Sequence, residues 1–301
     1  MPAELISPSA AGLWHSLADP WAQGVVRRAF YEVALIGVVA GPLGCWIVFY
    51  GLSYSAESLA HGLLPGLVIA ALTGAPLLLG AALGLVLATL GIAVAARIPA
   101  IGRDTSVAVV ITTLFGLGVL LALSPASPPG IQALLFGDVL GASDLDLALA
   151  AGLGLVVLVS LRLLHRPLLA VGLDRGSARD LGISPTLVDV ALLALIALAI
   201  LVAVQGLGNL LVVAMLVAPG ASAAHLATRM TPMMALAAAL AVAAGFAGIY
   251  ASYYLGTAAG ASIAAAAATA YFVSFAVGAR GRRGGRWRRR RPASAGSVYA
   301  G

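Results

Sequence analysis

Residues 186–204 read TLVDVALLALIALAILVAV, and Asp189 is the one charged residue in this stretch. A helix needs about 20 mostly apolar residues to cross a bilayer. Similar stretches recur along the chain, which is 61% hydrophobic and 9% charged. Soluble domains are roughly half apolar and about a quarter charged. The sequence therefore predicts an all-α, polytopic integral membrane protein and excludes a soluble enzyme.

The apolar stretches divide the chain into about eight or nine predicted transmembrane helices. The second contains His61 and Pro65, and the seventh contains Asn209 and Pro219. Polar residues and irregular backbone at membrane depth usually line a cavity or the bundle interior, so these two helices are expected to face inward. The predicted spans are 32–51, 55–73, 76–96, 106–125, 147–166, 186–204, 206–226, 233–254 and 258–278.

Small side chains are expected to help these helices pack. Gly80 and Gly84 are four residues apart, a spacing that lets two helix backbones approach closely in lipid. The single cysteine, Cys45, lies in an apolar run and cannot form an internal disulfide. We expect it to act as a small apolar residue in a helix.

The arginines predict the orientation in the membrane. All 17 basic residues are Arg; four lie in the segment 162–189 and eight in the segment 280–291. Basic residues concentrate on the cytoplasmic side, so both segments, and the C-terminus, are expected in the cytoplasm. The protein is then a multi-pass protein of the inner or plasma membrane. Nine spans would place the N-terminus outside, where Arg27 and Arg28 break the rule unless they lie on a surface helix or the span count differs by one.

Three parts are predicted along the chain. Residues 1–30, which include Trp14 and Trp21, suit a helix on the membrane surface with its tryptophans at the lipid headgroups. Residues 31–278 form the transmembrane domain, and residues 279–301 form a basic, disordered cytoplasmic tail. Because the tail follows a membrane span, it is expected to touch anionic lipid rather than nucleic acid.

The segment ESLAHGLLPG, residues 57–66, is the strongest candidate for chemistry. Glu57 and His61 are four residues apart, so on a helix they point from the same face. A carboxylate oxygen and an imidazole nitrogen on one face make a partial site for a divalent transition metal. Pro65 removes a backbone hydrogen bond and frees a carbonyl near His61. The residues alone leave open a second interpretation, in which a Glu–His hydrogen bond only joins two helices.

Other polar residues have simpler explanations than metal binding. Three aspartates between the fourth and fifth spans suit a solvated loop better than a second acidic cluster. Two amides beside the seventh span are expected to hydrogen-bond across helices, and the histidine at its end is expected at the membrane interface. These residues are Asp138, Asp144, Asp146, Gln205, Asn209 and His225.

The segment 167–185 contains a predicted short amphipathic helix at 177–181, which is ended by Gly182 and closed by Pro185. In a cytoplasmic loop this helix could dock a partner protein, or the segment could be an ordinary loop. The chain has no Lys, and a phosphate-binding loop needs a Lys to reach the phosphates. If ATP drives this protein, another subunit must hydrolyse it.

Over about residues 22–278 the chain resembles the permease subunit of ATP-binding-cassette importers for zinc, manganese or iron. The most specific match is Glu57-x-x-x-His61 followed by Leu64-Pro65-Gly66. Further matches follow in the order that is typical of this family. They are Arg103-Asp104, the segment LFGDVLG at 135–141, Asp174-x-x-x-Ala178-x-x-Leu181-Gly182, the segment 210–219 and Tyr253-Tyr254-Leu255.

The resemblance implies a type II importer-like helical bundle that works as a homodimer, with the pathway between the subunits. It implies that Glu57 and His61 bind the metal in transit, and that zinc, manganese or iron is cargo rather than a permanent cofactor. A cytoplasmic ATPase subunit would dock on the coupling loop, and an extracytoplasmic metal-binding protein would deliver the ion. The coupling residues would be Asp174, Ala178, Leu181 and Gly182.

Two positions depart from the family pattern. The family usually has Asp where this chain has Glu57, which is a conservative change for a metal ligand. The family commonly has Asp after the Tyr-Tyr-Leu motif, and Gly256 stands there in this chain. This second change removes a carboxylate, so the motif supplies no ligand from that end.

Three other functions fit the architecture. A permease for a metal chelate, such as a siderophore or cobalamin, would want a wide pathway without paired ionisable ligands, and Glu57 and His61 argue against it. If the protein were a membrane scaffold, a pull-down on it would recover no ATPase subunit. If it were a proton-coupled carrier, its uptake would depend on the proton gradient and not on ATP. The sequence does not select one metal, because nitrogen and oxygen donors suit zinc, manganese and iron.

Overall fold

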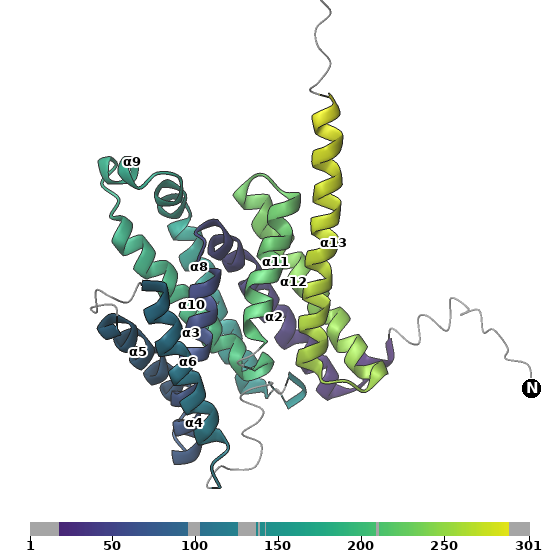
Figure 1. Ribbon diagram of the computed structural model, residues 1–301. Helices are drawn as coiled ribbons and strands as arrows, with labels where there is room; N and C mark the ends of the chain where they lie inside the picture. The colour runs from purple at the N-terminus through teal and green to yellow at the C-terminus, as the bar shows by residue number, and fades with distance from the viewer. Residues whose placement is uncertain are drawn as a thin grey trace, which may run out of the picture.

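The computed structural model describes residues 18–95, 103–125, 137, 139–141, 143–208 and 211–288. Within these residues the regular structure is helical and contains no β-strand, and the long helices pack into one bundle (Figure 1). This confirms the predicted all-α class. The elements are α2 (Gly24–Phe49), α3 (Ser53–Gly62), α4 (Leu64–Thr73), α5 (Leu77–Ala95), α6 (Arg103–Ala122), η1 (Val139–Gly141), α8 (Asp144–Leu173), α9 (Arg175–Asp180), α10 (Pro185–Leu207), α11 (Val212–Leu226), α12 (Met230–Leu255) and α13 (Ala259–Arg288).

The apolar helices account for the predicted spans. Six segments among the described residues are long and apolar enough to cross a membrane, and α3 with α4 forms one of them. Three shorter apolar segments, Leu77–Gly91, Val107–Ala122 and Val212–Leu226, lie where the other spans were predicted. Together these segments agree with the expected eight or nine helices. The second span is interrupted at Leu63, between α3 and α4, as its proline predicted.

Several helices continue beyond the apolar stretches that revealed them. α2 begins at Gly24 rather than at residue 32, and Phe30 is buried in the core. α8 runs on to Leu173, so much of the polar segment 162–189 is helical rather than a loop. α13 runs on to Arg288, which corrects the expectation of a disordered tail from residue 279 onward. An apolar stretch marks only the part of a helix that lies in lipid. The hydrogen-bonded helix can continue beyond that stretch into water.

The N-terminal end of α2 is held by packing and by an ion pair. The ring of Trp21 stacks on Phe30 with centroids 4.4 Å apart, and its Nε1 donates to the hydroxyl of Tyr250 over 3.0 Å. Trp21 therefore packs against α12, where a position at the lipid headgroups was expected. At the same end, Arg28 Nε lies 3.0 Å from Asp144 Oδ1 at the start of α8. This pair gives Arg28 a partner on the N-terminal side of the bundle.

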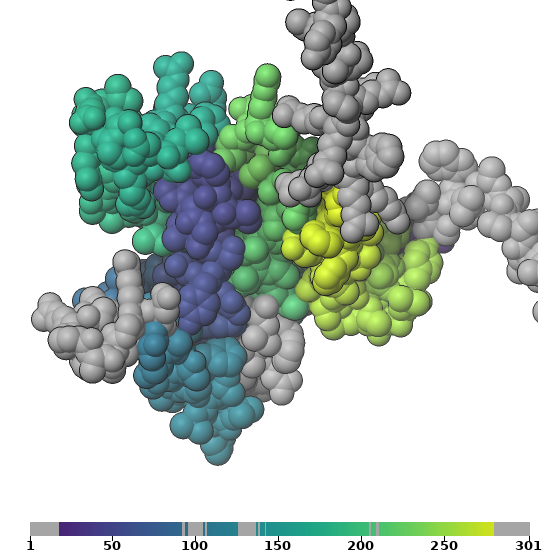
Figure 2. Space-filling view, turned by 45° about the horizontal axis from the view of Figure 1, so that its top comes forward, coloured from purple at the N-terminus to yellow at the C-terminus, as the bar shows by residue number. Residues whose placement is uncertain are grey.

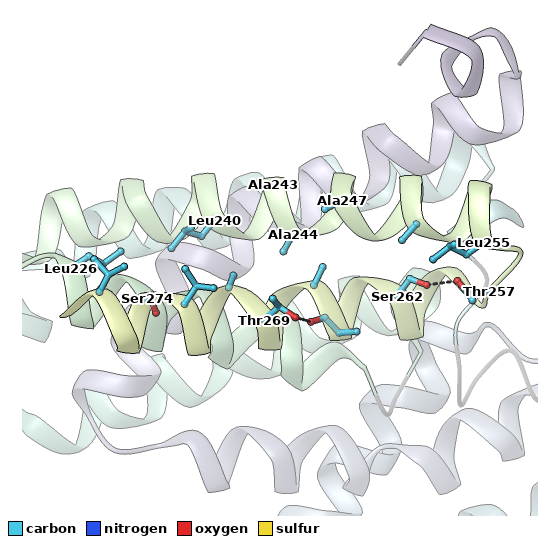
Figure 3. A pocket seen from close by; sticks show the side chains of 16 residues that line it. Leu226, Leu240, Ala243, Ala244, Ala247, Leu255, Thr257, Ser262, Thr269 and Ser274 are labelled. Atoms are coloured by element: carbon cyan, nitrogen blue, oxygen red, sulfur yellow. Dashed lines mark hydrogen bonds between the residues drawn. The ribbon is translucent and has the colours of Figure 1, made fainter. Parts of the chain in front are cut away.

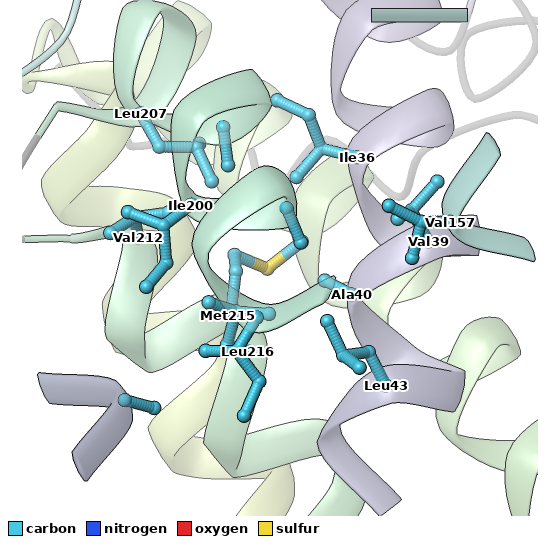
Figure 4. Packing of buried hydrophobic residues seen from close by; sticks show 14 of the residues in the cluster. Ile36, Val39, Ala40, Leu43, Val157, Ile200, Leu207, Val212, Met215 and Leu216 are labelled. Atoms are coloured by element: carbon cyan, nitrogen blue, oxygen red, sulfur yellow. The ribbon is translucent and has the colours of Figure 1, made fainter. Parts of the chain in front are cut away.

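α2 is the central helix and packs against α8, α11 and α12. Figure 4 shows Ala40 and Leu43 of α2 beside Met215 and Leu216 of α11. Glycine permits this approach, because a Cβ on Gly44 would overlap the carbonyl oxygen of Leu216. Close backbone packing of this kind stabilises helix pairs in lipid, where the hydrophobic effect gives little drive to association.

Gly80 and Gly84, whose spacing predicted close helix packing, lie where α5 approaches α4. A Cβ on Gly66 would overlap the carbonyl oxygen of Gly80, and a Cβ on Gly84 would crowd the backbone of Leu63. The close approach expected from Gly80 and Gly84 is therefore present. It places α5 against the break between α3 and α4.

Two ends of the bundle can be distinguished. The C-terminal ends of α2 and α8 meet the N-terminal end of α10 beside α9, and we call this the α9 end (Figure 1). α3 also starts here, because only Tyr50, Gly51 and Leu52 separate it from α2. The opposite end carries the Arg28–Asp144 pair and the capping box of α8, in which the Ser143 backbone N–H donates to the Asp146 carboxylate.

Candidate functional site

Glu57 and His61 lie on one face of α3, one turn apart, as their spacing predicted. His61 Nε2 is 3.9 Å from Glu57 Oε1, which is too far for a hydrogen bond. The Glu57 side chain is 53% exposed and the His61 side chain is 22% exposed. The pair is therefore two separate donor groups near a surface of the bundle, and the alternative of a Glu–His hydrogen bond joining two helices is not formed.

The imidazole of His61 is held by packing. Its ring centroid lies 4.9 Å from that of Phe115 on α6. The next residue, Gly62, is pressed against the side chains of Ala88 and Ile111. His61 Nδ1 is buried and has no hydrogen-bond partner among the described residues, while Nε2 is the nitrogen nearest Glu57.

The helix break beside His61 has an electrostatic consequence. α3 ends at Gly62 and α4 starts with Pro65 in its first turn, so His61 lies in the last turn of α3. The last carbonyls of a helix carry partial negative charge and favour a nearby cation. Leu63 is both the C-cap of α3 and the N-cap of α4, so the partial positive charge at the start of α4 offsets this effect.

The site is a half-site within one chain. Among the residues that the structure describes, no group of three or more His, Cys, Asp and Glu side chains could hold a metal ion. Glu57 and His61 offer two donors, and transition-metal sites in proteins commonly use four or more. The described residues of one chain therefore do not complete a transition-metal site at this pair.

α3 is accessible on the surface. Figure 2 shows the end of α2 and α3, in blue-violet, on one face between the α8–α10 region in teal and α11 in green. Tyr54 and Glu57 are both exposed on α3, whereas Ala56 and Ala60 are fully buried. One face of α3 is therefore open while the other packs into the core.

The second candidate element, α9, is a capped helix between α8 and α10. It spans Arg175–Asp180, and not 177–181 as the sequence suggested, because Asp174 caps its N-terminus. The Asp174 carboxylate accepts from the backbone N–H groups of Gly176 at 2.9 Å and Ser177 at 3.2 Å. The Ser177 hydroxyl donates to the same carboxylate, and these hydrogen bonds hold the pKa of Asp174 below its usual value. Gly182, with a φ of 76°, ends the helix.

The four expected coupling residues do not share one role in the structure. Ala178 is completely buried against the body of the bundle, so it cannot form part of a docking surface and instead anchors α9. Leu181 is 73% exposed, and Leu173 and Leu187 on either side are exposed to a similar degree. Asp174 and Gly182 set the two ends of the helix. Leu181 is the C-cap of α9, Leu173 ends α8 and Leu187 lies in the first turn of α10, so exposed apolar side chains flank the short helix, as they often do at protein-docking surfaces.

The remaining polar candidates have structural roles or lie outside the described residues. Asp144 pairs with Arg28, and Asp146 completes the capping box of α8, so neither belongs to an acidic cluster that binds metal. His225 packs between the rings of Tyr271 and Phe275. Outside the description lie Trp14, Asp138, Asn209 and the side chain of Gln205.

Sequence reasoning missed Glu32, which is 3% exposed on α2, with its carboxylate against Gly206 of α10. The signal was present, since Glu32 is a charged residue at the edge of the first predicted span, 32–51. Tyr50 and the Arg175–Asp189 pair were also missed, because their partners are far away in sequence.

A groove separate from the Glu57–His61 site has neither residue in its lining. It has a volume of about 750 Å³ and runs between α12 and α13 (Figure 3). Alanine, leucine and valine line it, and its polar groups are the hydroxyls of Thr257, Ser262, Thr269 and Ser274. These groups are poor ligands for a transition metal.

An apolar helical bundle with six candidate membrane spans among its described residues defines a multi-pass membrane protein. Residues 22–278 match the family described as the ABC 3 transport family, and the chain belongs to this family. The family is one of transport subunits rather than enzymes.

Relatives and a solved structure agree with this assignment. Manganese transport system membrane protein MntC of Halalkalibacterium halodurans is 34% identical over 210 residues, which cover 69% of this chain and 72% of that protein. A probable iron transport system membrane protein of Haemophilus influenzae is 30% identical over 217 residues, covering 72% and 80%. The structure of PsaBC from Streptococcus pneumoniae in complex with Fab matches with a TM-score of 0.81 at 27% identity, covering 87% of this chain and 95% of that one.

Proposed function

We propose that this chain is the membrane-spanning subunit of an ATP-driven importer of divalent transition-metal ions, and that the ion is its transported substrate. The observation that carries the proposal is the pair of donors, Glu57 and His61, on an interrupted span of an otherwise apolar bundle. Manganese and iron are the first metals to test, because the relatives described above are named for them. Zinc remains compatible with the same donors.

The exposure of Glu57 indicates what lies next to α3. Glu57 is in the second turn of α3, inside a candidate membrane span, where a charged side chain that faces lipid is costly. Glu57 is half exposed, so we place this face of α3 against an aqueous pathway and a second copy of the chain. In such a homodimer, two carboxylates and two imidazoles would converge and complete the half-site.

The energy source would be a separate ATPase subunit. This chain has no Lys with which to build a phosphate-binding loop, and α9 presents the exposed Leu181 between two spans. The four arginines of 162–189 support a cytoplasmic position for the α9 end. We therefore place the ATPase subunit at the α9 end and an extracytoplasmic metal-binding protein at the opposite end.

Metal uptake by cells that lack other importers tests the assignment. We expect His61→Ala and Glu57→Gln each to reduce manganese or iron uptake at least about tenfold, because each removes a direct ligand. His225→Ala is the matched control, since His225 packs on the rings of Tyr271 and Phe275, away from α3, and the variant should retain uptake. Unchanged uptake in His61→Ala, at equal membrane levels of the protein, would show that the site is wrong.

A further inference from the structure

The corner between α2 and α3 connects two parts that the proposed function treats separately. α3 carries Glu57 and His61, and α9 carries the surface proposed for the ATPase subunit. The corner consists of Phe49, Tyr50, Gly51 and Leu52. Its contacts reach the end of α8, which leads directly into α9.

The turn from α2 into α3 is short and fully hydrogen-bonded. Gly51 has a φ of 67°, which favours glycine because side chains are strained there. The backbone N–H of Leu52 donates to Ile47 over 2.8 Å, and the carbonyl of Leu52 accepts from Ala56 over 2.9 Å. The turn therefore fixes the start of α3 relative to the end of α2, and Glu57 follows one turn later.

The end of α2 is attached to the end of α8. The Tyr50 hydroxyl donates to the carbonyl of Leu168 over 2.8 Å. The ring of Phe49 fills the space over Gly172, where a Cβ would overlap it. One turn earlier, the rings of Trp46 and His165 meet edge to face with centroids 5.4 Å apart.

α8 is joined to α9 without a linker. Asp174 is both the C-cap of α8 and the N-cap of α9. Arg175 at the start of α9 forms a bidentate pair with Asp189 of α10, with N–O distances of 2.9 and 3.0 Å. A displacement of α9 would therefore be transmitted into the last two turns of α8, which include Leu168, the acceptor of Tyr50.

The Tyr50 hydroxyl remains a donor at physiological pH. Burial and the nearby Asp189 carboxylate raise the pKa of Tyr50 to about 12, against the opposing effect of Arg175. Since Asp189 and Arg175 both act on this hydroxyl, Tyr50 lies within electrostatic reach of the pair that fixes α9 to α10.

We propose that Tyr50 is a positioning residue that couples α9 to the metal ligands. Through its hydrogen bond to Leu168 and the rigid turn that follows it, movement of α9 shifts α3 and changes the separation of Glu57 and His61 from their counterparts in the second copy. This inference rests on the proposed function and adds to it a mechanical link between ATP hydrolysis and metal release.

The test uses the full complex, with its ATPase subunit and metal-delivery protein, in liposomes. Tyr50→Phe removes one hydroxyl and preserves the ring, so we expect metal uptake per ATP hydrolysed to fall about fivefold, the equivalent of one hydrogen bond. The ATP hydrolysis rate and the amount of assembled complex should change less than about twofold. Tyr31→Phe, the same change on an exposed residue of α2 at the opposite end, is the matched control.

A second variant, on α8, tests the contact between Gly172 and the ring of Phe49. Gly172→Ala displaces the ring of Phe49 and should lower the same uptake-to-hydrolysis ratio. A wild-type ratio in Tyr50→Phe and Gly172→Ala, or a loss of hydrolysis and uptake in equal proportion, would overturn the link. If the wild-type complex shows no ATP-dependent metal uptake at all, the proposed function itself is wrong.

Discussion

Glu57 and His61 are restrained to different degrees, and this difference suggests how they could bind and release an ion. Phe115 packs against the His61 ring, whereas Glu57 is half exposed and has freedom to turn. Ligand atoms at about 2.0–2.2 Å from one metal ion lie closer together than the 3.9 Å seen between Nε2 and Oε1. A small rotation of Glu57 toward a fixed imidazole would therefore close the pair on the ion.

Protons should compete with the metal at His61. A ligating imidazole must be neutral, so binding becomes weaker as the pH falls through the titration of the free histidine. Manganese binding to the purified permease should therefore weaken as the pH of the medium is lowered. Glu57→Gln should bind more weakly at every pH but keep this dependence. A pH-independent affinity in the wild-type protein would argue against histidine as a ligand.

At the scale of elements, α9 shows how a short helix becomes a rigid docking unit. Its six residues have an N-cap from Asp174, a buried anchor in Ala178 and a glycine end at Gly182. A helix this short is not stable alone. Its order therefore comes from the caps and from its contact with the bundle.

The cap makes the α9 segment sensitive to acid. Because the folded-state pKa of Asp174 lies below its unfolded value, the stabilisation is complete above the unfolded pKa and is lost as the pH falls through the folded one. Hydrogen exchange of the Gly176 and Ser177 amides should therefore accelerate, relative to uncapped amides, below about pH 4. In Asp174→Asn, which caps without titrating, this acceleration should be absent. Equal pH profiles in the two proteins would contradict the role of the cap.

The exposed leucine of α9 provides a test of docking. Leu181→Asp places a charge on the proposed contact surface without disturbing the core, so affinity purification of the permease should recover much less ATPase subunit. Leu163→Asp, at an equally exposed leucine on α8, would introduce a charge in the membrane region and is not a suitable control. Leu181→Ala, which shortens the side chain without adding a charge, separates the loss of the leucine from the effect of the charge. Undiminished recovery with Leu181→Asp would show that α9 is not the docking element.

The sequence predicted the class of fold and the face shared by Glu57 and His61 because both follow from local spacing. Apolar stretches of the right length located the spans, and Pro65 located the break in the second one. The ends of α8 and α13 were not predictable in this way, since polar residues continue both helices beyond the lipid. Tyr50 was not found because its partner, Leu168, is 118 residues away, and no local pattern marks such a contact.

At the scale of the whole molecule, charges concentrate at the ends of an apolar bundle and at α3. The Arg28–Asp144 pair neutralises an arginine at the end opposite α9, where the predicted topology had left it without explanation. The Arg175–Asp189 pair neutralises Arg175 at the α9 end. Between these ends, Glu57 stands out as an exposed carboxylate, and a second copy of the chain would cover it.

We propose that two chains hold one metal ion between their Glu57 and His61 side chains. Manganese binding to the purified permease tests this proposal, with stoichiometry from titration and ligand identity from pulsed electron paramagnetic resonance of protein with nitrogen-15 histidine. We expect one ion for every two chains, coupled to histidine nitrogen, and loss of both signals in His61→Ala but not in His225→Ala. An ion bound once per chain, or histidine coupling that survives His61→Ala, would contradict it.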